Sequence, residues 1–174
     1  MERMTGKSRG GAGGWGEGDG RPGPSPLELL ERAREAASRA YAPYSRFRVG
    51  AALLLADGGV LTACNVENAS YGLSMCAERS AIAAMVARGL RDPVAVAVVG
   101  SGDGDFGRPC PPCGACRQIL VEFNPDMRVV LASPEGPLVY SAHGLLPHSF
   151  GLRGGSQRLR SEERRVGKKC RSRW

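Results

Sequence analysis

CNVENASYGLSMCAERSAI occupies residues 64–82, and PCGACRQILVEF occupies residues 112–123. Each stretch places cysteine at the start of an expected helix: Cys76 in the first, and the pair Cys113 and Cys116 in the second. The exposed amides and the helix dipole at such a position favour thiolate over thiol. Three thiolates would give a tetrahedral zinc ion three protein ligands and leave one position open for water, as in a catalytic site.

Glu78 supplies a carboxylate two residues after Cys76. Residues two apart in a first helical turn are splayed around the axis, so a ligand and a carboxylate can flank one ion without both binding it. Two alternatives stay open: Glu78 could close the site as a fourth ligand, and a C-x-x-C pair alone also occurs in redox and structural-zinc motifs. Cys110 extends the pair to C-x-x-C-x-x-C, but the prolines at 111 and 112 favour a loop position for it.

The segments around these stretches predict an α/β domain that begins at Ser25. Ser25 can cap a helix, Pro26 suits its first position and Glu28 completes a capping box, and apolar residues then recur at helical spacing to about Tyr41. Asp57-Gly58-Gly59 is a hairpin signal. The expected elements are helices at 25–41, 76–88 and 113–123 and strands at 49–56, 60–65, 94–99, 128–132 and 138–140. Helices that alternate with buried strands indicate a three-layer α/β/α sandwich.

Two segments of different composition flank this domain. Residues 1–24 are rich in glycine, and residues 152–174 carry nine basic and two acidic groups; we interpret both as disordered tails. Residues 26–151 carry eleven basic and twelve acidic groups, so the net charge of +7 is a property of the C-terminal tail. We interpret that tail as a solvated appendage and expect no nucleic-acid partner.

The sequence contains neither a run of about 18 apolar residues nor an apolar leader at its N-terminus. We therefore expect no membrane association and a cytoplasmic location. In that compartment the six cysteines would serve as thiols for a metal site rather than as a disulfide framework.

Over roughly residues 26–151 the chain resembles the small homotetrameric cytidine deaminases, and we interpret residues 25–151 as that domain. The resemblance rests on the two stretches quoted above, on AYAPYSRFRVGAALL at 40–54 and on LLPHSF at 145–150. It implies a mixed, roughly five-stranded sheet in the middle of the sandwich and one zinc ion per subunit. It also implies hydrolytic deamination of cytidine and deoxycytidine to uridine and deoxyuridine, in pyrimidine salvage, by a homotetramer with shared active sites.

The resemblance further implies roles for individual residues. Cys76, Cys113 and Cys116 bind zinc, Glu78 shuttles protons beside a zinc-bound hydroxide, and Arg79 hydrogen-bonds the thiolates. The residues implied to contact the nucleoside are Phe47 on the pyrimidine, Ala77 through its backbone, Asn65 and Glu67 on the ribose 3′-hydroxyl, their neighbours Val66, Asn68, Ala69 and Ser70, and Tyr71 and Phe150, which complete a neighbouring subunit's pocket.

Two other functions stay open. The first is deamination of a cytosine-nucleoside antibiotic of the blasticidin type, against which the run Asn65-Val66-Glu67-Asn68, suited to an unmodified ribose, argues. The second is a non-catalytic, zinc-stabilised binding module. A chain with its own apolar helices and strands has less need of structural zinc than a small zinc peptide has.

Overall fold

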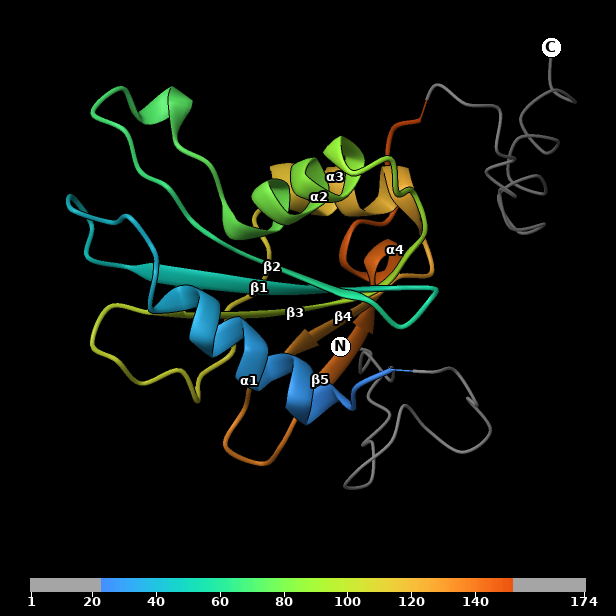
Figure 1. Cartoon of the computed structure of the whole chain (residues 1–174), viewed down its shortest axis with the longest axis horizontal. Coiled ribbons are helices and arrows are strands. Elements are labelled where there is room, and N and C mark those ends of the chain that lie inside the picture. The colour runs from blue at the N-terminus through green and yellow to red at the C-terminus, as the bar shows by residue number, and fades with distance from the viewer. Residues whose placement is uncertain (1–22, 152–174) are drawn as a thin grey trace, which may run out of the picture.

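A mixed sheet of five strands forms the middle of the computed structural model, which describes residues 23–151 (Figure 1). The strands are β1 (Arg48–Leu55), β2 (Val60–Cys64), β3 (Pro93–Ser101), β4 (Arg128–Leu131) and β5 (Leu138–Ser141), in the spatial order β2-β1-β3-β4-β5. β3 and β4 pair in parallel, and the other neighbours are antiparallel. The predicted mixed five-stranded sheet is confirmed. The predicted tails lie outside the described residues, apart from Gly23 and Pro24.

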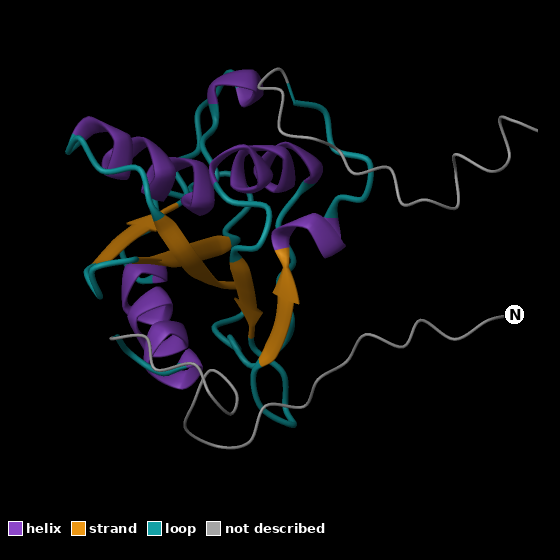
Figure 2. Ribbon diagram, turned by 90° about the vertical axis from the view of Figure 1, so that its right-hand side faces the viewer, coloured by secondary structure: helices purple, strands orange, loops and turns teal. Residues whose placement is uncertain are grey.

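Helices cover both faces of this sheet (Figure 2). α1 (Pro26–Ala37) lies on one face, and α2 (Ala77–Ala87), α3 (Gly114–Phe123) and the short α4 (Ala142–Leu145) lie on the other. Because successive side chains of a strand point to opposite faces, Leu54 belongs to the core under α1 while Leu53 belongs to the core under α2 and α3. The predicted three-layer sandwich is confirmed.

α1 begins as predicted, at a capping box. The Ser25 hydroxyl accepts from the Glu28 amide at 3.3 Å, and the Glu28 carboxylate accepts from the Ser25 amide at 2.7 Å. The helix ends at Ala37, so its predicted extension to Tyr41 is wrong. The Tyr41 amide donates to the Asn65 carbonyl at 3.1 Å and is thereby withdrawn from the helix. A tertiary contact therefore overrides the helical pattern of the local sequence.

The other predicted bounds differ from the structure by at most two residues. The hairpin turn is confirmed: Gly58 has a φ of 87°, and the Gly59 amide donates to the Asp57 carboxylate at 2.9 Å. A 3-10 helix, η1 (Tyr71–Leu73), and α4 were not predicted. Within residues 23–151, none of the helices has the length and apolar character that a membrane crossing needs.

The strand directions place the starts of α2 and α3 at one edge of the sheet. β2 and β3 each run antiparallel to β1, so they point the same way. The chain leaves β2 for α2 and leaves β3 for α3, and both connections therefore start at the same edge. The carboxyl ends of strands are where α/β sheets form binding sites. This topology brings the two cysteine-bearing helix starts together.

Gly50 lies where the backbone of α1 packs directly against β1. A Cβ atom added there would lie 1.9 Å from the Ala33 carbonyl oxygen and 2.6 Å from the Ala37 amide nitrogen. Because these are backbone atoms, the helix must move, and we expect Gly50→Ala to lower the free energy of unfolding by about 1–3 kcal/mol. Chemical denaturation at a fixed protein concentration measures the loss. Gly72→Ala is the control, since nothing lies within 4 Å of its added Cβ; equal losses in both variants would contradict this packing.

Candidate metal centre and active site

Three sulfur atoms meet where α2 and α3 begin. Cys76 is the N-cap residue of α2, Cys113 is the N-cap residue of α3, and Cys116 is buried in the first turn of α3. The three sulfur atoms lie within 4.8 Å of one another, and Cys76 Sγ is 4.0 Å from Cys113 Sγ. Tetrahedral zinc with Zn–S bonds of about 2.3 Å holds its sulfur ligands about 3.8 Å apart. The triangle therefore has the dimensions of a zinc site.

The environment of the three thiols differs. Burial raises the pKa of Cys76 and of Cys116, and the charge of Glu78 raises both further. Burial opposes ionisation of Cys113 too, but interactions with the Cys116 amide and with the Cys116 and Cys76 thiols outweigh it, so the pKa of Cys113 is lowered. A bound cation would favour the thiolate form of all three cysteines, because metal binding deprotonates its thiol ligands.

Glu78 lies beside the sulfur triangle and outside it. Glu78 is only 4% exposed. Burial raises the pKa of its carboxyl group, and a hydrogen bond with the Cys116 thiol partly opposes that rise. Among residues 23–151, the cluster close enough to share one ion contains three cysteines and no carboxylate. The arrangement is therefore three sulfur ligands with a buried acid next to them.

Cys110 also lies near the site but does not belong to the triangle. Burial raises the pKa of its thiol to about 11, and the charges of Glu78 and Cys76 contribute to the shift. A Cβ atom added to Gly100 would lie 2.5 Å from Cys110 Sγ and 2.8 Å from Phe47 Cε1, so glycine lets both side chains settle on β3. Phe47 and Cys110 line a cavity of about 540 Å³; the three cysteines of the triangle and Glu78 are not part of its lining.

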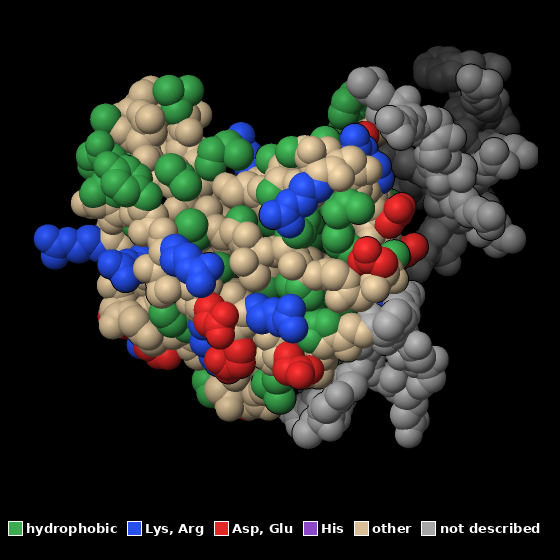
Figure 3. Space-filling view, viewed as in Figure 1, with side chains coloured by type: hydrophobic (Ala, Val, Ile, Leu, Met, Phe, Trp, Pro, Cys, Tyr) green, Lys and Arg blue, Asp and Glu red, His purple; other side chains and the backbone are tan. Residues whose placement is uncertain are grey.

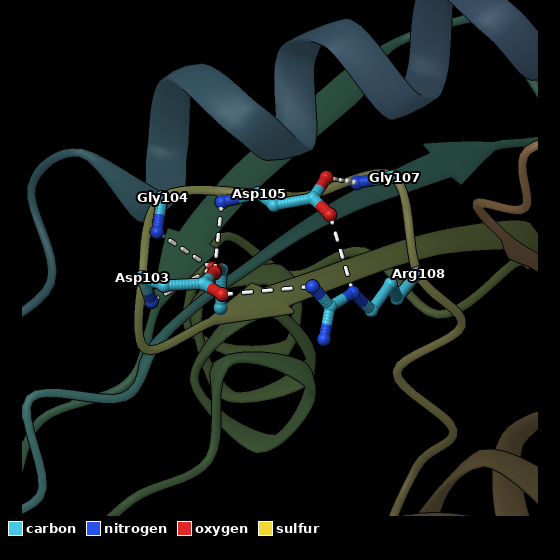
Figure 4. Close-up of polar contacts among 6 residues, drawn as sticks. Asp103, Gly104, Asp105, Gly107 and Arg108 are labelled. Atoms are coloured by element: carbon cyan, nitrogen blue, oxygen red, sulfur yellow. Dashed lines mark hydrogen bonds and ion pairs between the residues drawn. The ribbon is translucent and has the colours of Figure 1, made fainter.

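Residues 102–108 form a polar loop that supplies part of the cavity lining, and Figure 4 shows the polar contacts within this loop. The Asp103 carboxylate accepts from the Ser101 hydroxyl at 2.7 Å and from the Asp105 amide at 3.0 Å. The Arg108 guanidinium lies 3.2 Å from the Asp105 carboxylate and 3.7 Å from the Asp103 carboxylate. These side-chain contacts link residues 101–108 to one another.

Asn65 and Glu67 brace the loop that carries Phe47. The Asn65 side chain accepts from the Val49 amide at 2.8 Å and donates to the Phe47 carbonyl at 2.9 Å. The Glu67 carboxylate accepts from the Tyr44 amide at 2.9 Å, and the Ser45 hydroxyl donates to it as well. This bracing was not foreseen, because the partners lie about twenty positions away and share no motif with the two residues.

The remaining predicted site residues lie on two stretches of chain. Val66 forms isolated β-bridges with Tyr41 and Met75. The carboxamide oxygen of Asn68 accepts a hydrogen bond from the Ser70 amide at 2.8 Å. Ala69 is exposed and Ala77 is fully buried at the first position of α2. Tyr71 is 76% exposed and Phe150 71% exposed. Arg79 is half-buried in the first turn of α2, and its side chain makes no hydrogen bond or ion pair with another residue of 23–151.

Known proteins resemble most of the described chain. Residues 25–133, which include all three cysteines, match the family described as the cytidine and deoxycytidylate deaminase zinc-binding region. The chain belongs to this deaminase family. A cytidine deaminase of Halalkalibacterium halodurans is 49% identical over 124 residues, which cover 70% of this chain and 91% of that protein. The predicted family and its zinc cofactor are confirmed.

Solved deaminase structures agree with this assignment. The crystal structure of cytidine deaminase from Burkholderia pseudomallei is 48% identical, with a TM-score of 0.66, and the match covers 71% of this chain and 98% of that one. A more distant relative, the blasticidin-S deaminase of Bacillus cereus, is 34% identical over 117 residues, covering 65% of this chain and 82% of that protein.

The geometry of the sulfur triangle predicts the metal content of the protein. We expect this deaminase to be purified with one zinc ion per chain. Cys76→Ser, Cys113→Ser and Cys116→Ser should each lose the tightly held metal, because a serine hydroxyl is a far weaker zinc ligand than a thiolate. Elemental analysis after gel filtration measures the ratio. Cys110→Ser is the matched control and should keep its zinc; loss of zinc there would mean that the ligand set is wrong.

Proposed function

We propose that this chain hydrolytically deaminates cytidine and deoxycytidine, giving uridine or deoxyuridine and ammonia. The observation that carries the proposal is the three-sulfur triangle with the buried Glu78 outside it. A site with three protein ligands leaves tetrahedral zinc a position for water, whereas a structural site is closed by a fourth ligand. The cytidine deaminases that resemble the chain over most of its described length support the choice of reaction.

Glu78 would carry the protons of this reaction. Zinc, when bound, supplies Lewis-acid activation of the attacking water. Glu78 takes one proton from this water and delivers it to N3 of the pyrimidine, and then carries the second proton of the water to the amino group at C4, which leaves as ammonia. Its burial raises the carboxyl pKa, which suits a group that must both accept and donate a proton near neutral pH. The overall change consumes one water and releases one ammonia.

The other predicted residues would bind the nucleoside. Phe47, at the wall of the cavity, offers an aromatic face to the pyrimidine, and the backbone of Ala77 lies at the first position of α2. Asn65 keeps one N–H and one lone pair beyond its two hydrogen bonds, so it can still bind a ribose hydroxyl together with Glu67. Arg79 would hydrogen-bond the thiolates and withdraw negative charge from them.

A homotetramer with shared sites would explain the exposed hydrophobic surface. We name Tyr44, Val66, Tyr71 and Leu73 the apolar lobe; hydrophobic side chains gather there around η1 (Figure 3). The Tyr44 and Tyr71 rings pack edge to face at 6.3 Å, and Leu73 is 68% exposed. Exposed apolar patches of this kind mark sites of association. Tyr71 and Phe150 would then reach a neighbouring subunit's pocket.

The cellular setting follows from the same chemistry. The five cysteines of the described residues are unpaired, and zinc binding needs reduced thiols, which the cytoplasm maintains. A nucleoside substrate indicates a role in pyrimidine salvage. The near-neutral charge of residues 26–151 argues against a polynucleotide substrate. The proposed partners are a free nucleoside and further copies of this chain.

The blasticidin-type deaminase is the second candidate function, because one such enzyme is 34% identical over 117 residues. Parallel assays with cytidine, deoxycytidine, blasticidin S and a single-stranded oligonucleotide separate the possibilities. We expect turnover of the two free nucleosides and none of the oligonucleotide. Preferential turnover of blasticidin S would replace the proposed function with the second candidate.

Glu78→Gln tests the proton shuttle. The amide keeps the shape of the side chain but cannot take up and release the proton, so we expect turnover to fall by at least about 10²-fold. The change in absorbance as cytidine becomes uridine measures the rate. Zinc content should stay at one per chain, because Glu78 lies outside the sulfur triangle. Retained activity in the zinc-loaded variant would exclude the shuttle role, and loss of zinc would favour Glu78 as a ligand.

Mixed oligomers test whether Phe150 acts in a neighbouring subunit. Glu78→Gln and Phe150→Ala should each be poorly active alone, since one lacks the shuttle and the other lacks an aromatic side chain at the pocket. Dissociated and reassembled together, the two variants should regain part of the wild-type rate, because some sites then combine an intact Glu78 with an intact Phe150. The cytidine assay before and after mixing measures the recovery. No recovery in confirmed mixed tetramers would place Phe150 in its own subunit's site or outside any site.

A further inference from the structure

The start of α3 carries two of the predicted zinc ligands and also a residue that contacts a distant segment. Cys113 and Cys116 hold the metal centre, and the next residue, Arg117, is half-buried and reaches two carbonyl oxygens. Its Nε donates to the Pro112 carbonyl at 2.8 Å, and its Nη1 donates to the Leu145 carbonyl at 3.0 Å. One side chain therefore ties the approach to the metal centre to the segment that follows β5.

The direction of the Pro112 carbonyl affects the position of Cys113. It belongs to the peptide plane that joins Pro112 to Cys113, so fixing its direction fixes how the chain enters the N-cap position. Pro112 itself is buried and lacks an amide donor, so the carbonyl is its main-chain hydrogen-bonding group. A guanidinium presents its donors in a rigid fork, which lets Arg117 set two carbonyls relative to each other.

Gln118 continues the same connection. Its Nε2 donates to the Phe150 carbonyl at 2.7 Å, while the Phe150 side chain is 71% exposed. Two residues earlier, His148 has a φ of 58°, the left-handed region that L side chains rarely adopt. The chain is thus turned at His148 and then held through the backbone of Phe150, with the aromatic ring directed outward.

We propose that Arg117 and Gln118 are positioning residues that fasten residues 145–150 to the metal-bearing start of α3. Through Arg117, zinc binding and the order of this segment stabilise each other; through Gln118, the same segment presents Phe150. The first part rests on the zinc centre, and the second part rests on the proposed function, in which Phe150 completes a substrate pocket.

Zinc affinity tests the Arg117 contact without any use of activity. In competition with a chromogenic chelator, Arg117→Gln should bind zinc about 10–100-fold more weakly than the wild type, the usual cost of removing a group that orients a ligand. Arg117→Lys should remain weakened, because an ammonium keeps the charge but lacks the fork that spans two carbonyls. Full recovery of zinc affinity in the lysine variant would show that only the charge of Arg117 matters, and it would overturn the positioning role.

Arg91→Gln is the matched control. Arg91 also donates to two main-chain carbonyls, those of Val86 at 3.0 Å and Leu90 at 2.6 Å, but it is exposed beyond the end of α2. Its loss should leave zinc affinity unchanged. The melting temperature of each metal-free variant is measured alongside, and hydrogen exchange of the amides of residues 145, 146 and 148–150 is followed with and without zinc. Zinc should slow this exchange in the wild type but not in Arg117→Gln; equal slowing in both would overturn the coupling.

Gln118→Leu separates the two parts of the proposal. This variant removes the donor to Phe150 and should weaken zinc binding far less than Arg117→Gln does, because both Arg117 contacts remain, while KM for cytidine rises more than kcat falls. An unchanged KM would overturn the role of Gln118. If the wild type binds zinc and Arg117→Gln weakens it, yet no nucleoside is turned over, the proposed function fails while the Arg117 coupling stands.

Discussion

The convergence of two helix N-termini at one edge of the sheet is the constraint on which the site depends. α2 follows β2 and α3 follows β3, and these strands point the same way because each pairs antiparallel with β1. Each helix start brings cysteine and exposed amides, so the sulfurs are gathered where positive helix-end potential is strongest. If either strand ran the other way, the helix after it would start from the opposite end of the sheet, and Cys76 and Cys113 would no longer meet.

The same convergence buries a carboxyl group. Glu78 is almost fully covered, and removing it from water raises its pKa. Without a metal, burial and the charge of Glu78 favour the protonated thiols of Cys76 and Cys116. A cation at the triangle reverses this balance. The burial of Glu78 and the convergence of the three sulfurs therefore follow from one arrangement of two helix starts.

The surroundings of the centre are held by side chains that bind the main chain. Asn65 and Glu67 fasten the loop that carries Phe47, and Arg117 and Gln118 fasten the segment that carries Phe150. In both cases a polar side chain from a regular element fixes the backbone of an irregular one. Loops positioned in this way by a rigid scaffold are where binding residues are commonly found.

The sequence by itself determined what depends on neighbours along the chain. The capping box at Ser25, the Asp57-Gly58-Gly59 turn and the alternation of buried strands with helices follow local rules, and the spacing of Cys113 and Cys116 places both on one helical turn. A second predicted helix start added Cys76 and Glu78, and the resemblance to a known family implied their roles in the same site. These expectations agree with the structure because each is specified within a few residues or by a recognisable motif.

Only the tertiary structure decided the contacts between distant segments. The end of α1 at Ala37 depends on a hydrogen bond from Tyr41 to Asn65, and the approach of Phe47 to β3 depends on the missing side chain of Gly100. The attachment of Arg117 to Leu145 joins elements that share no pattern. Such contacts are selected by packing and by the need to satisfy backbone carbonyls after the layers have assembled, and no periodicity of the chain encodes them.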